Sequence, residues 1–251
     1  MTSTVFLLGG AFSGLTNYMP TMLGGAITNG QTQVQVPYNN VGLFLNTVQQ
    51  GADMLNAFIT NGTGPMVVFG HSLGAVVSSY WLANYAADSG IEPADLSFVF
   101  IGNSVHKYGG ALGPESNSEW QNWFGEGVAA PDNTPYTVLD IIRQYDGWAD
   151  WPTGTTNITS DFNALAGQNS IHPNYQAVSP SLTATGNVHY TPTVSGSPGN
   201  ITYLWSMTQP VPLLGTVWLD PIPALDQDIR PTIEAGYDRP VTIPTPTYPG
   251  S

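Results

Sequence analysis

The sequence contains no cysteine, and this absence excludes several kinds of chemistry. A chain without cysteine has no disulfide bonds, no thiolate metal ligands and no cysteine nucleophile. Any covalent catalysis must therefore depend on another side chain.

Basic residues are nearly as scarce as cysteine. The chain has 4 Lys and Arg against 17 Asp and Glu, which gives a net charge of -13, and only 8% of its residues are charged. Nucleic acids and anionic membranes are bound through basic patches. Because the sequence offers no such patch, we expect neither as a partner, and we expect a surface built mainly from uncharged polar residues and glycine.

Long apolar runs are also missing. No run approaches the ~20 residues that span a bilayer, and the first residues lack the basic region of a signal peptide. We expect a soluble protein that would reach a cell envelope or a virion by a non-classical route. With 251 residues, 41% of them hydrophobic, the chain is long enough to bury a sizeable core.

The most informative stretch is Gly-His-Ser-Leu-Gly at residues 70–74, which follows a short apolar run. It matches the G-x-S-x-G nucleophile elbow, in which a serine occupies a sharp turn between a strand and a helix. Crowding at that turn leaves no space for side chains two residues before and after the serine, where Gly70 and Gly74 stand. The pattern predicts Ser72 as a nucleophile and directs the Leu73 N–H at a forming oxyanion.

Strand-like and helix-like segments alternate along the first 145 residues. Strands are expected at residues 4–8, 33–36, 65–69, 96–101 and 138–145, and helices at 41–59 and after residue 74. This alternation predicts an α/β fold of the α/β-hydrolase type, with a doubly wound, mostly parallel sheet and helices on both faces. The loop after the first strand would open at the carboxyl edge of the sheet, where Ala11 is a candidate second oxyanion donor.

The rest of the chain is less regular. Residues 104–134 resemble a lid, because they form a long loop that contains Trp120 and Trp123. Residues 187–194 and 200–207 predict a C-terminal β-hairpin, and residues 226–235 a helix interrupted by a proline. We expect one domain over residues 1–239, followed by a Pro/Thr-rich extended tail over 240–251.

A serine nucleophile needs a base and an orienting acid, which follow it in the order Ser, Asp or Glu, His in α/β hydrolases. Asp146 lies just beyond the last strand of the alternating region, and Asp150 in the same loop remains an alternative acid. His106 precedes that strand and so has the wrong order. His172 lies on a loop after the acid, whereas His189 lies within the predicted hairpin. The sequence favours Asp146 and His172 without excluding Asp150 or His189.

Several further stretches carry a family resemblance. They are residues 8–11, 36–38, 70–75, 101–103, 144–152, 163–167, 212–214 and 236–239. Together they resemble the PE-PPE hydrolase domain of mycobacteria, a cutinase-like branch of the α/β-hydrolase superfamily, over nearly the whole chain. The resemblance implies a serine esterase acting on acyl esters, and it supports the triad Ser72, Asp146 and His172.

Two features depart from that family. Ala11 stands where the family tends to have Thr, and the sequence begins directly at the first strand, whereas the family's domain usually follows a helical module. We therefore expect a free-standing copy of the domain, encoded by a bacterium or a phage.

Two hypotheses about function remain. The first is a serine esterase, without metal or cofactor, for medium or long acyl chains such as those of mycobacterial envelope lipids. Four tryptophans would then wall an apolar groove near Ser72: Trp120, Trp123, Trp148 and Trp151. The second is a structural or surface-binding protein, for example a virion component, that keeps a hydrolase fold without turnover. Intact Ser, Asp and His counterparts favour the enzyme.

Overall fold

Short runs of Val, Phe, Leu and Ile form the strands of the sheet, because branched and aromatic side chains fit a pleated surface that is buried on both faces. The computed structural model describes residues 2–13, 17–41, 45–154, 156–215 and 223–248. Its main sheet contains β1 (Thr4–Leu8), β2 (Thr32–Gln35), β3 (Met66–His71), β4 (Leu96–Ile101), β5 (Thr137–Arg143), β6 (Asn187–Tyr190) and β9 (Ile201–Ser206).

The order of these strands is β2-β1-β3-β4-β5-β9-β6, and all neighbours are parallel except β6 and β9. This arrangement confirms the α/β class expected from the sequence. The order reverses direction between β1 and β3, so the connections that leave these two strands diverge at their carboxyl ends. Such a switch point is where doubly wound sheets build their sites.

Each face of the sheet has its own hydrophobic core. Helices α1 (Leu45–Thr60) and α2 (Leu73–Asn84) cover one face, where the fully buried Trp81 donates a 3.0 Å hydrogen bond to Asn56 of α1. The other face is covered by the 3₁₀ helix η1 (Met19–Gly25) and by the segment around Tyr175. The second face therefore has a thinner cover than a pair of long α-helices would provide.

The predicted C-terminal hairpin forms, and both of its strands, β6 and β9, belong to the main sheet. β6 pairs antiparallel with β9, and β9 continues the sheet by pairing in parallel with β5. Between them, β7 (Thr193–Val194) and β8 (Ser197–Pro198) form a small two-stranded extension. The hairpin thus completes the sheet beside the strand that leads to Asp146.

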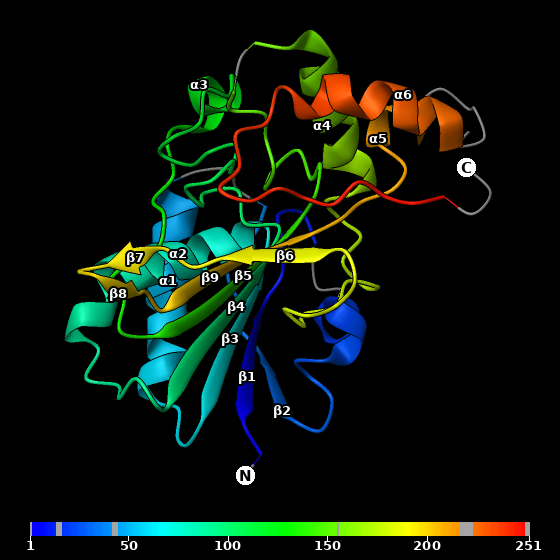
Figure 1. Ribbon diagram of the computed structural model, residues 1–251. Helices are drawn as coiled ribbons and strands as arrows, with labels where there is room; N and C mark the ends of the chain where they lie inside the picture. The colour runs from blue at the N-terminus through cyan, green and yellow to red at the C-terminus, as the bar shows by residue number, and fades with distance from the viewer. Residues whose placement is uncertain (1, 14–16, 42–44, 155, 216–222, 249–251) are drawn as a thin grey trace.

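Four helices gather beyond the carboxyl ends of the strands (Figure 1). They are α3 (Trp120–Phe124), α4 (Ile158–Ser170), α5 (Pro212–Gly215) and α6 (Pro223–Glu234), while the 3₁₀ turn η2 (Ala86–Asp88) follows α2. α3 is the one short helix in the lid-like residues 104–134. The sequence did not predict α4, because its many small and polar residues give it little amphipathic pattern. The Asn157 side chain caps α4 by accepting from the N–H groups of Thr159 and Ser160.

Two boundaries differ from the expectation. The helix expected from residue 41 is described from Leu45 onward; Val41 is 63% exposed, and residues 42–44 lie outside the described residues. Residues 240–248 contain no helix or strand, and Ile243 among them is buried in the core, while residues 249–251 of the expected tail lie outside the described residues. The described part of the tail therefore packs against the sheet domain.

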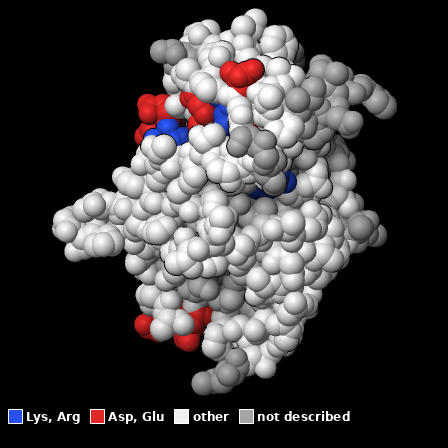
Figure 2. All heavy atoms as spheres, turned by 45° about the vertical axis from the view of Figure 1, so that its right-hand side comes forward, with Lys and Arg blue, Asp and Glu red and all other residues white. Residues whose placement is uncertain are grey.

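Charged side chains are few on the face shown in Figure 2, where they form small separate groups. All four basic side chains of the chain are engaged. Lys107 pairs with Asp132, Arg230 with Asp226, and Arg239 with Asp150 and Glu234, while Arg143 donates to the carbonyl of Asn174. Each of the four basic side chains is therefore used in a contact within the fold. None of the described helices is long and apolar enough to cross a membrane.

Candidate active site

Ser72 stands on the turn between β3 and α2, with a backbone conformation of φ 54° and ψ -120°. A non-glycine residue in this region is strained, and such strain concentrates at functional sites. The flanking glycines are required by space. A Cβ atom at Gly74 would lie 2.2 Å from the carbonyl oxygen of Leu8, and one at Gly70 would lie 2.8 Å from the backbone of Gly74. Backbone packing alone therefore explains both glycines of the motif.

Ser72, His172 and Asp146 lie in one hydrogen-bonded row. The Oγ of Ser72 is 2.8 Å from Nε2 of His172, and Nδ1 of His172 is 2.8 Å and 2.9 Å from the two carboxylate oxygens of Asp146. Because the carboxylate accepts from Nδ1–H, the Nε2 atom is left to accept the hydroxyl proton of Ser72. This is the arrangement of a nucleophile, a general base and an orienting acid.

Asp146 is fully buried, but it is well supplied with donors. Besides His172, the Tyr175 hydroxyl donates to its Oδ2 at 2.7 Å, and the Trp148 N–H donates to its Oδ1 at 3.0 Å. Burial alone would raise the pKa of this carboxyl. The attraction of His172 and the hydrogen bonds to the carboxylate outweigh burial, so the pKa of Asp146 lies below its usual value. The carboxyl therefore stays ionised beside His172.

Gly102 makes room for the imidazole at the end of β4. Its φ is +61°, and a Cβ atom there would lie 2.9 Å from Cε1 of His172 and 3.3 Å from Oδ2 of Asp146. A side chain at this position would push the two groups apart. Gly102 thus serves the site although it carries no chemistry itself.

Asp150, the alternative acid, has other partners. Its carboxylate accepts two hydrogen bonds from Arg239, at 2.6 Å and 2.8 Å, and one from the N–H of Tyr145 at 2.7 Å. Arg239 is itself held by Glu234 and packs over the Tyr237 ring, 4.0 Å from its centroid. Asp150 therefore closes the turn that presents Asp146, and it does not contact His172.

The remaining candidate histidines lie away from Ser72. His189 is exposed on the edge strand β6. His106 is buried, and it accepts from the Tyr108 N–H at Nδ1 while its Nε2 lies 2.5 Å from the Ala149 carbonyl. Burial lowers the pKa of His106 to about 4, so it is neutral at ordinary pH. These contacts make His106 a support for the loop that carries Asp146.

The two expected oxyanion donors belong to segments that lie close to Ser72. The Leu73 N–H is the first of α2, and Ala11 follows Gly10, where a Cβ atom would lie 3.0 Å from Cβ of Ser72. Within the described residues, neither N–H has a hydrogen-bond acceptor. Both are therefore free to bind a developing oxyanion.

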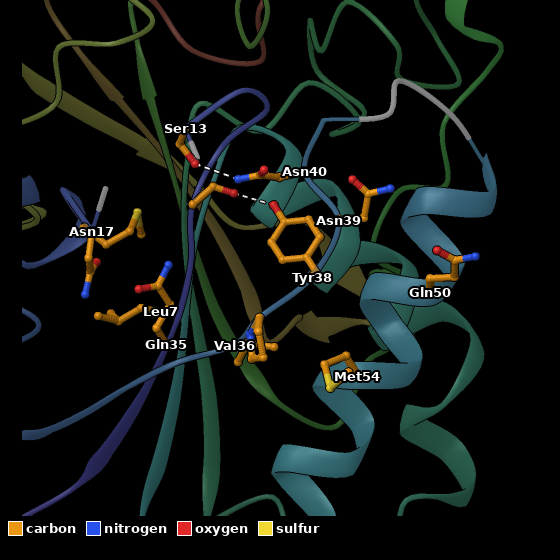
Figure 3. A pocket seen from close by; sticks show the side chains of 13 residues that line it. Leu7, Ser13, Asn17, Gln35, Val36, Tyr38, Asn39, Asn40, Gln50 and Met54 are labelled. Atoms are coloured by element: carbon orange, nitrogen blue, oxygen red, sulfur yellow. Dashed lines mark hydrogen bonds between the residues drawn. The ribbon is translucent and has the colours of Figure 1, made fainter. Parts of the chain in front are cut away.

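The loop that carries Ala11 is held in place from outside. The Asn40 side chain donates to the Gly10 carbonyl. It also donates to the Ser13 hydroxyl, and the Tyr38 hydroxyl donates to the Gly9 carbonyl, as Figure 3 shows. Gly9, Ser13, Tyr38 and Asn40 line a pocket of about 570 Å³ between the loop, β2 and α1, and Ser72 is not among its lining residues. The pocket is therefore adjacent to the oxyanion loop without being the site itself.

The four tryptophans are placed differently from one another. Trp120 packs on Trp148 with ring centroids 5.1 Å apart, and the Trp148 ring lies 6.5 Å from that of His172. Trp123 is 75% exposed on α3, whereas Trp151 is only 8% exposed and packs with Ala111 and Ala164. The structure brings Trp120 and Trp148 together near His172. It does not bring Trp151 to the surface beside them.

Some residues at the site are not among those that the sequence predicts to act there. Tyr175 donates to Asp146 and also accepts from the Arg143 N–H at 3.0 Å, so it ties the acid to the end of β5. Its position shortly after His172 is the one signal in the sequence. Among the described residues, no group of three or more His, Asp or Glu side chains is arranged to hold a metal ion.

The family model and the related proteins that match this chain point to the same family. A family model described as the PE-PPE domain matches residues 28–238. The chain is 33% identical to Esterase PE16 of Mycobacterium tuberculosis over 242 residues, and 30% identical to PE family protein PE3 of the same organism over 221 residues. These matches cover 90% and 80% of this chain but 45% of each relative, so the chain spans less than half their length.

Solved structures are more distant. A cutinase-like protein from Cryptococcus sp. superposes with a TM-score of 0.46 at 17% identity, covering 70% of this chain and 89% of that one. The ydeN gene product from B. subtilis gives a TM-score of 0.40 at 11% identity, covering 93% of this chain and all of that one, 100%.

Proposed function

The chain belongs to the PE-PPE domain family, and from this membership and the Ser72 site we propose that it is an esterase/lipase-type serine hydrolase acting on acyl esters. The observation that carries the proposal is the continuous row from Ser72 Oγ through His172 to Asp146, with contacts of 2.8–2.9 Å. The relative that is 33% identical over 242 aligned residues is named an esterase, which points to the same chemistry.

In the proposed reaction, Ser72 Oγ attacks the acyl carbon while its proton passes to Nε2 of His172. The carbonyl oxygen becomes an oxyanion, which the N–H groups of Leu73 and Ala11 stabilise. When the tetrahedral intermediate collapses, His172 returns the proton to the alcohol, which leaves, and an acyl-Ser72 ester remains. A water molecule then attacks the acyl carbon and gives a proton to Nε2 of His172. When the bond between the acyl carbon and Ser72 Oγ breaks, His172 returns that proton to Oγ and the carboxylic acid leaves.

Asp146 acts through the imidazole. Its low pKa keeps the carboxylate ionised while His172 is transiently protonated, so it stabilises the imidazolium and keeps Nδ1 as the donor. The hydrogen bonds from Tyr175 and Trp148 already hold the carboxylate in place, so it does not have to reorient when His172 becomes positively charged.

We further propose an apolar acyl group as the substrate's acid part, such as the medium or long chains of mycobacterial envelope lipids. Trp120, Phe124 and Trp148 form a contiguous aromatic cluster near His172, and Trp123 is exposed on the same helix. The scarcity of charge on the protein also suits an uncharged substrate.

A fluorophosphonate probe tests the proposed activity directly, because it reacts with activated serines. We expect one covalent label, located at Ser72 by mass spectrometry, together with hydrolysis of p-nitrophenyl butyrate. Ser72→Ala should lose both, with a fall in kcat of about 10⁶, and it should unfold at the same temperature. Ser78→Ala, which changes a serine within α2, is the matched control. A folded wild-type protein that neither labels nor hydrolyses would refute the proposal.

A further inference from the structure

His71 is a buried histidine that the proposed reaction does not use. It ends β3 immediately before Ser72, and it is only 5% exposed. Its ring lies 5.1 Å from the ring of His172 and 5.5 Å from that of Tyr18, centroid to centroid. A buried titratable group so close to the site invites a functional explanation.

Both ring nitrogens of His71 have hydrogen-bond partners, and the partners determine the tautomer. Nε2 lies 3.1 Å from the carbonyl oxygen of His172, which can only accept, so Nε2 must carry the proton. Nδ1 is then an acceptor, and it receives the Tyr18 hydroxyl proton at 2.5 Å. The Tyr18 oxygen in turn accepts from the Gly10 N–H at 2.7 Å. With Nε2 protonated, the three hydrogen bonds run in one direction along the row: Gly10 donates to Tyr18, Tyr18 donates to His71, and His71 donates to the His172 carbonyl.

The row joins two parts of the site that are far apart in the sequence. At one end is the backbone of Gly10, the residue before the oxyanion donor Ala11. At the other end is the backbone of His172. A Cβ atom on Gly10 would lie 3.2 Å from the Tyr18 oxygen and 3.4 Å from Nδ1 of His71, so the loop sits closely against both side chains.

Tyr18 donates to His71 only while His71 is neutral, since a proton on Nδ1 would force the Tyr18 hydroxyl to change from donor to acceptor. Burial, together with repulsion from His172, lowers the pKa of His71 to about 3. The pairing with Tyr18 therefore persists over the ordinary range of pH.

We propose that Tyr18 and His71 form a positioning relay, which holds the oxyanion loop and the backbone of His172 at a set distance from each other across Ser72. The inference rests on the proposed esterase function. Neither side chain touches the reacting atoms, so both are positioning residues. Because the relay acts on the geometry of the reaction and not on the substrate, its loss should lower kcat and leave KM nearly unchanged.

Three variants separate the links of the relay. Tyr18→Phe removes the hydroxyl between Gly10 and His71. His71→Ala removes both links, whereas His71→Gln can still donate to the His172 carbonyl through its amide nitrogen. Tyr136→Phe is the matched control, because the Tyr136 hydroxyl is also buried and donates to the Ile91 carbonyl at 2.9 Å, at the amino end of β5.

We expect kcat for p-nitrophenyl butyrate to fall about tenfold in Tyr18→Phe and about a hundredfold in His71→Ala, with KM within about threefold of wild type. His71→Gln should recover part of the loss, and the double variant Tyr18→Phe/His71→Gln should lose less than the product of the single losses. Tyr136→Phe should keep the wild-type kcat. Wild-type kcat in both Tyr18→Phe and His71→Gln would overturn the relay.

Two results keep this inference separate from the proposed function. If wild-type protein hydrolyses the ester and labels at Ser72 while the variants match it, the relay fails and the esterase stands. Independently of activity, ¹⁵N NMR of histidine-labelled protein should find His71 as the neutral Nε2–H tautomer between pH 5 and 8. An Nδ1–H tautomer or a protonated ring in that range would refute the relay even in an active enzyme.

Discussion

Asp146 and Asp150 occupy the same turn after β5 and are both buried, yet only Asp150 has a permanently charged partner. Asp146 faces His172 and a tyrosine hydroxyl, whereas Asp150 faces the guanidinium of Arg239. One carboxylate is therefore placed to act on an imidazole, and the other to neutralise a buried cation. The same residue type has two physical tasks within five positions.

Substitution of each aspartate by asparagine should separate these tasks. Asp146→Asn should lower kcat for p-nitrophenyl butyrate by about 10⁴, because an amide that donates to Nδ1 holds His172 in the wrong tautomer. The melting temperature of Asp146→Asn should stay close to that of the wild type.

Asp150→Asn should do the reverse. It leaves Arg239 buried without its main counter-charge, so the free energy of unfolding should fall by about 3–5 kcal/mol. Measured below the unfolding transition, kcat should stay within about tenfold of wild type, since Asp150 does not contact His172. If Asp150→Asn lost activity as Asp146→Asn is expected to, the assignment of the acid would be wrong.

At the scale of elements, the lid-like segment and the acid-bearing turn are joined through Trp148. The N–H of Trp148 donates to Asp146, its carbonyl accepts from Ala111 of the lid-like segment, and its ring packs on Trp120 and Phe124 of α3. α3 therefore lies over the turn that holds the acid. Trp123, on the same helix, makes no such contact and is exposed.

This difference predicts that α3 binds acyl chains through Trp123. Trp123→Ala should lower kcat/KM for a dodecanoyl ester about tenfold or more relative to an acetyl ester, because burying a large apolar side chain contributes about 1.5–3 kcal/mol. The melting temperature should not change, as the side chain is exposed.

Phe162→Ala is the matched control for Trp123→Ala. Phe162 is 55% exposed on α4, so its substitution removes an exposed aromatic ring from another helix. It should leave the ratio between the two esters unchanged. An equal loss for both esters in Trp123→Ala would remove this side chain from acyl binding.

At the scale of the whole molecule, the fold buries more aspartate side chains than it pairs with arginine. Asp140 of β5 is 2% exposed, and one of its oxygens has no partner among the described residues, while the other accepts from Asn103 at 2.8 Å. Burial raises the pKa of Asp140 from 3.8 to about 7, and the hydrogen bond from Asn103 only partly opposes this. The folded protein therefore holds a proton that the unfolded chain releases near pH 4.

The consequence is a stability that falls with rising pH. Between about pH 4 and 7 the unfolded chain has lost the Asp140 proton and the folded state has kept it, so each rise in pH favours unfolding. Asp140→Asn keeps the acceptor for Asn103 and cannot ionise. In urea unfolding, wild type should lose about 2–3 kcal/mol more than this variant between pH 5 and 8. An identical pH dependence in both proteins would show that Asp140 does not titrate in this range.

The sequence alone determined the features that depend on near neighbours along the chain. The strands β1, β3, β4 and β5 were predictable because their apolar runs are short and sharply bounded. The elbow was predictable because crowding at Gly70 and Gly74 arises within a few residues of Ser72. α4 was not, since its close approach to the acid-bearing turn, where a Cβ on Gly167 would collide with the Tyr145 carbonyl, is a contact between distant segments.

Only the tertiary structure decided which aspartate and which histidine approach Ser72. Asp150 is drawn away by Arg239, a residue 89 positions later, and His172 meets Ser72 from 100 positions away. Local spacing carries no record of such pairings, because they are selected by the packing of α4, α6 and the sheet as a whole. The relay of Tyr18 and His71 is of the same kind: each residue is ordinary in sequence, and its role arises from two backbone groups that the fold brings to either side of it.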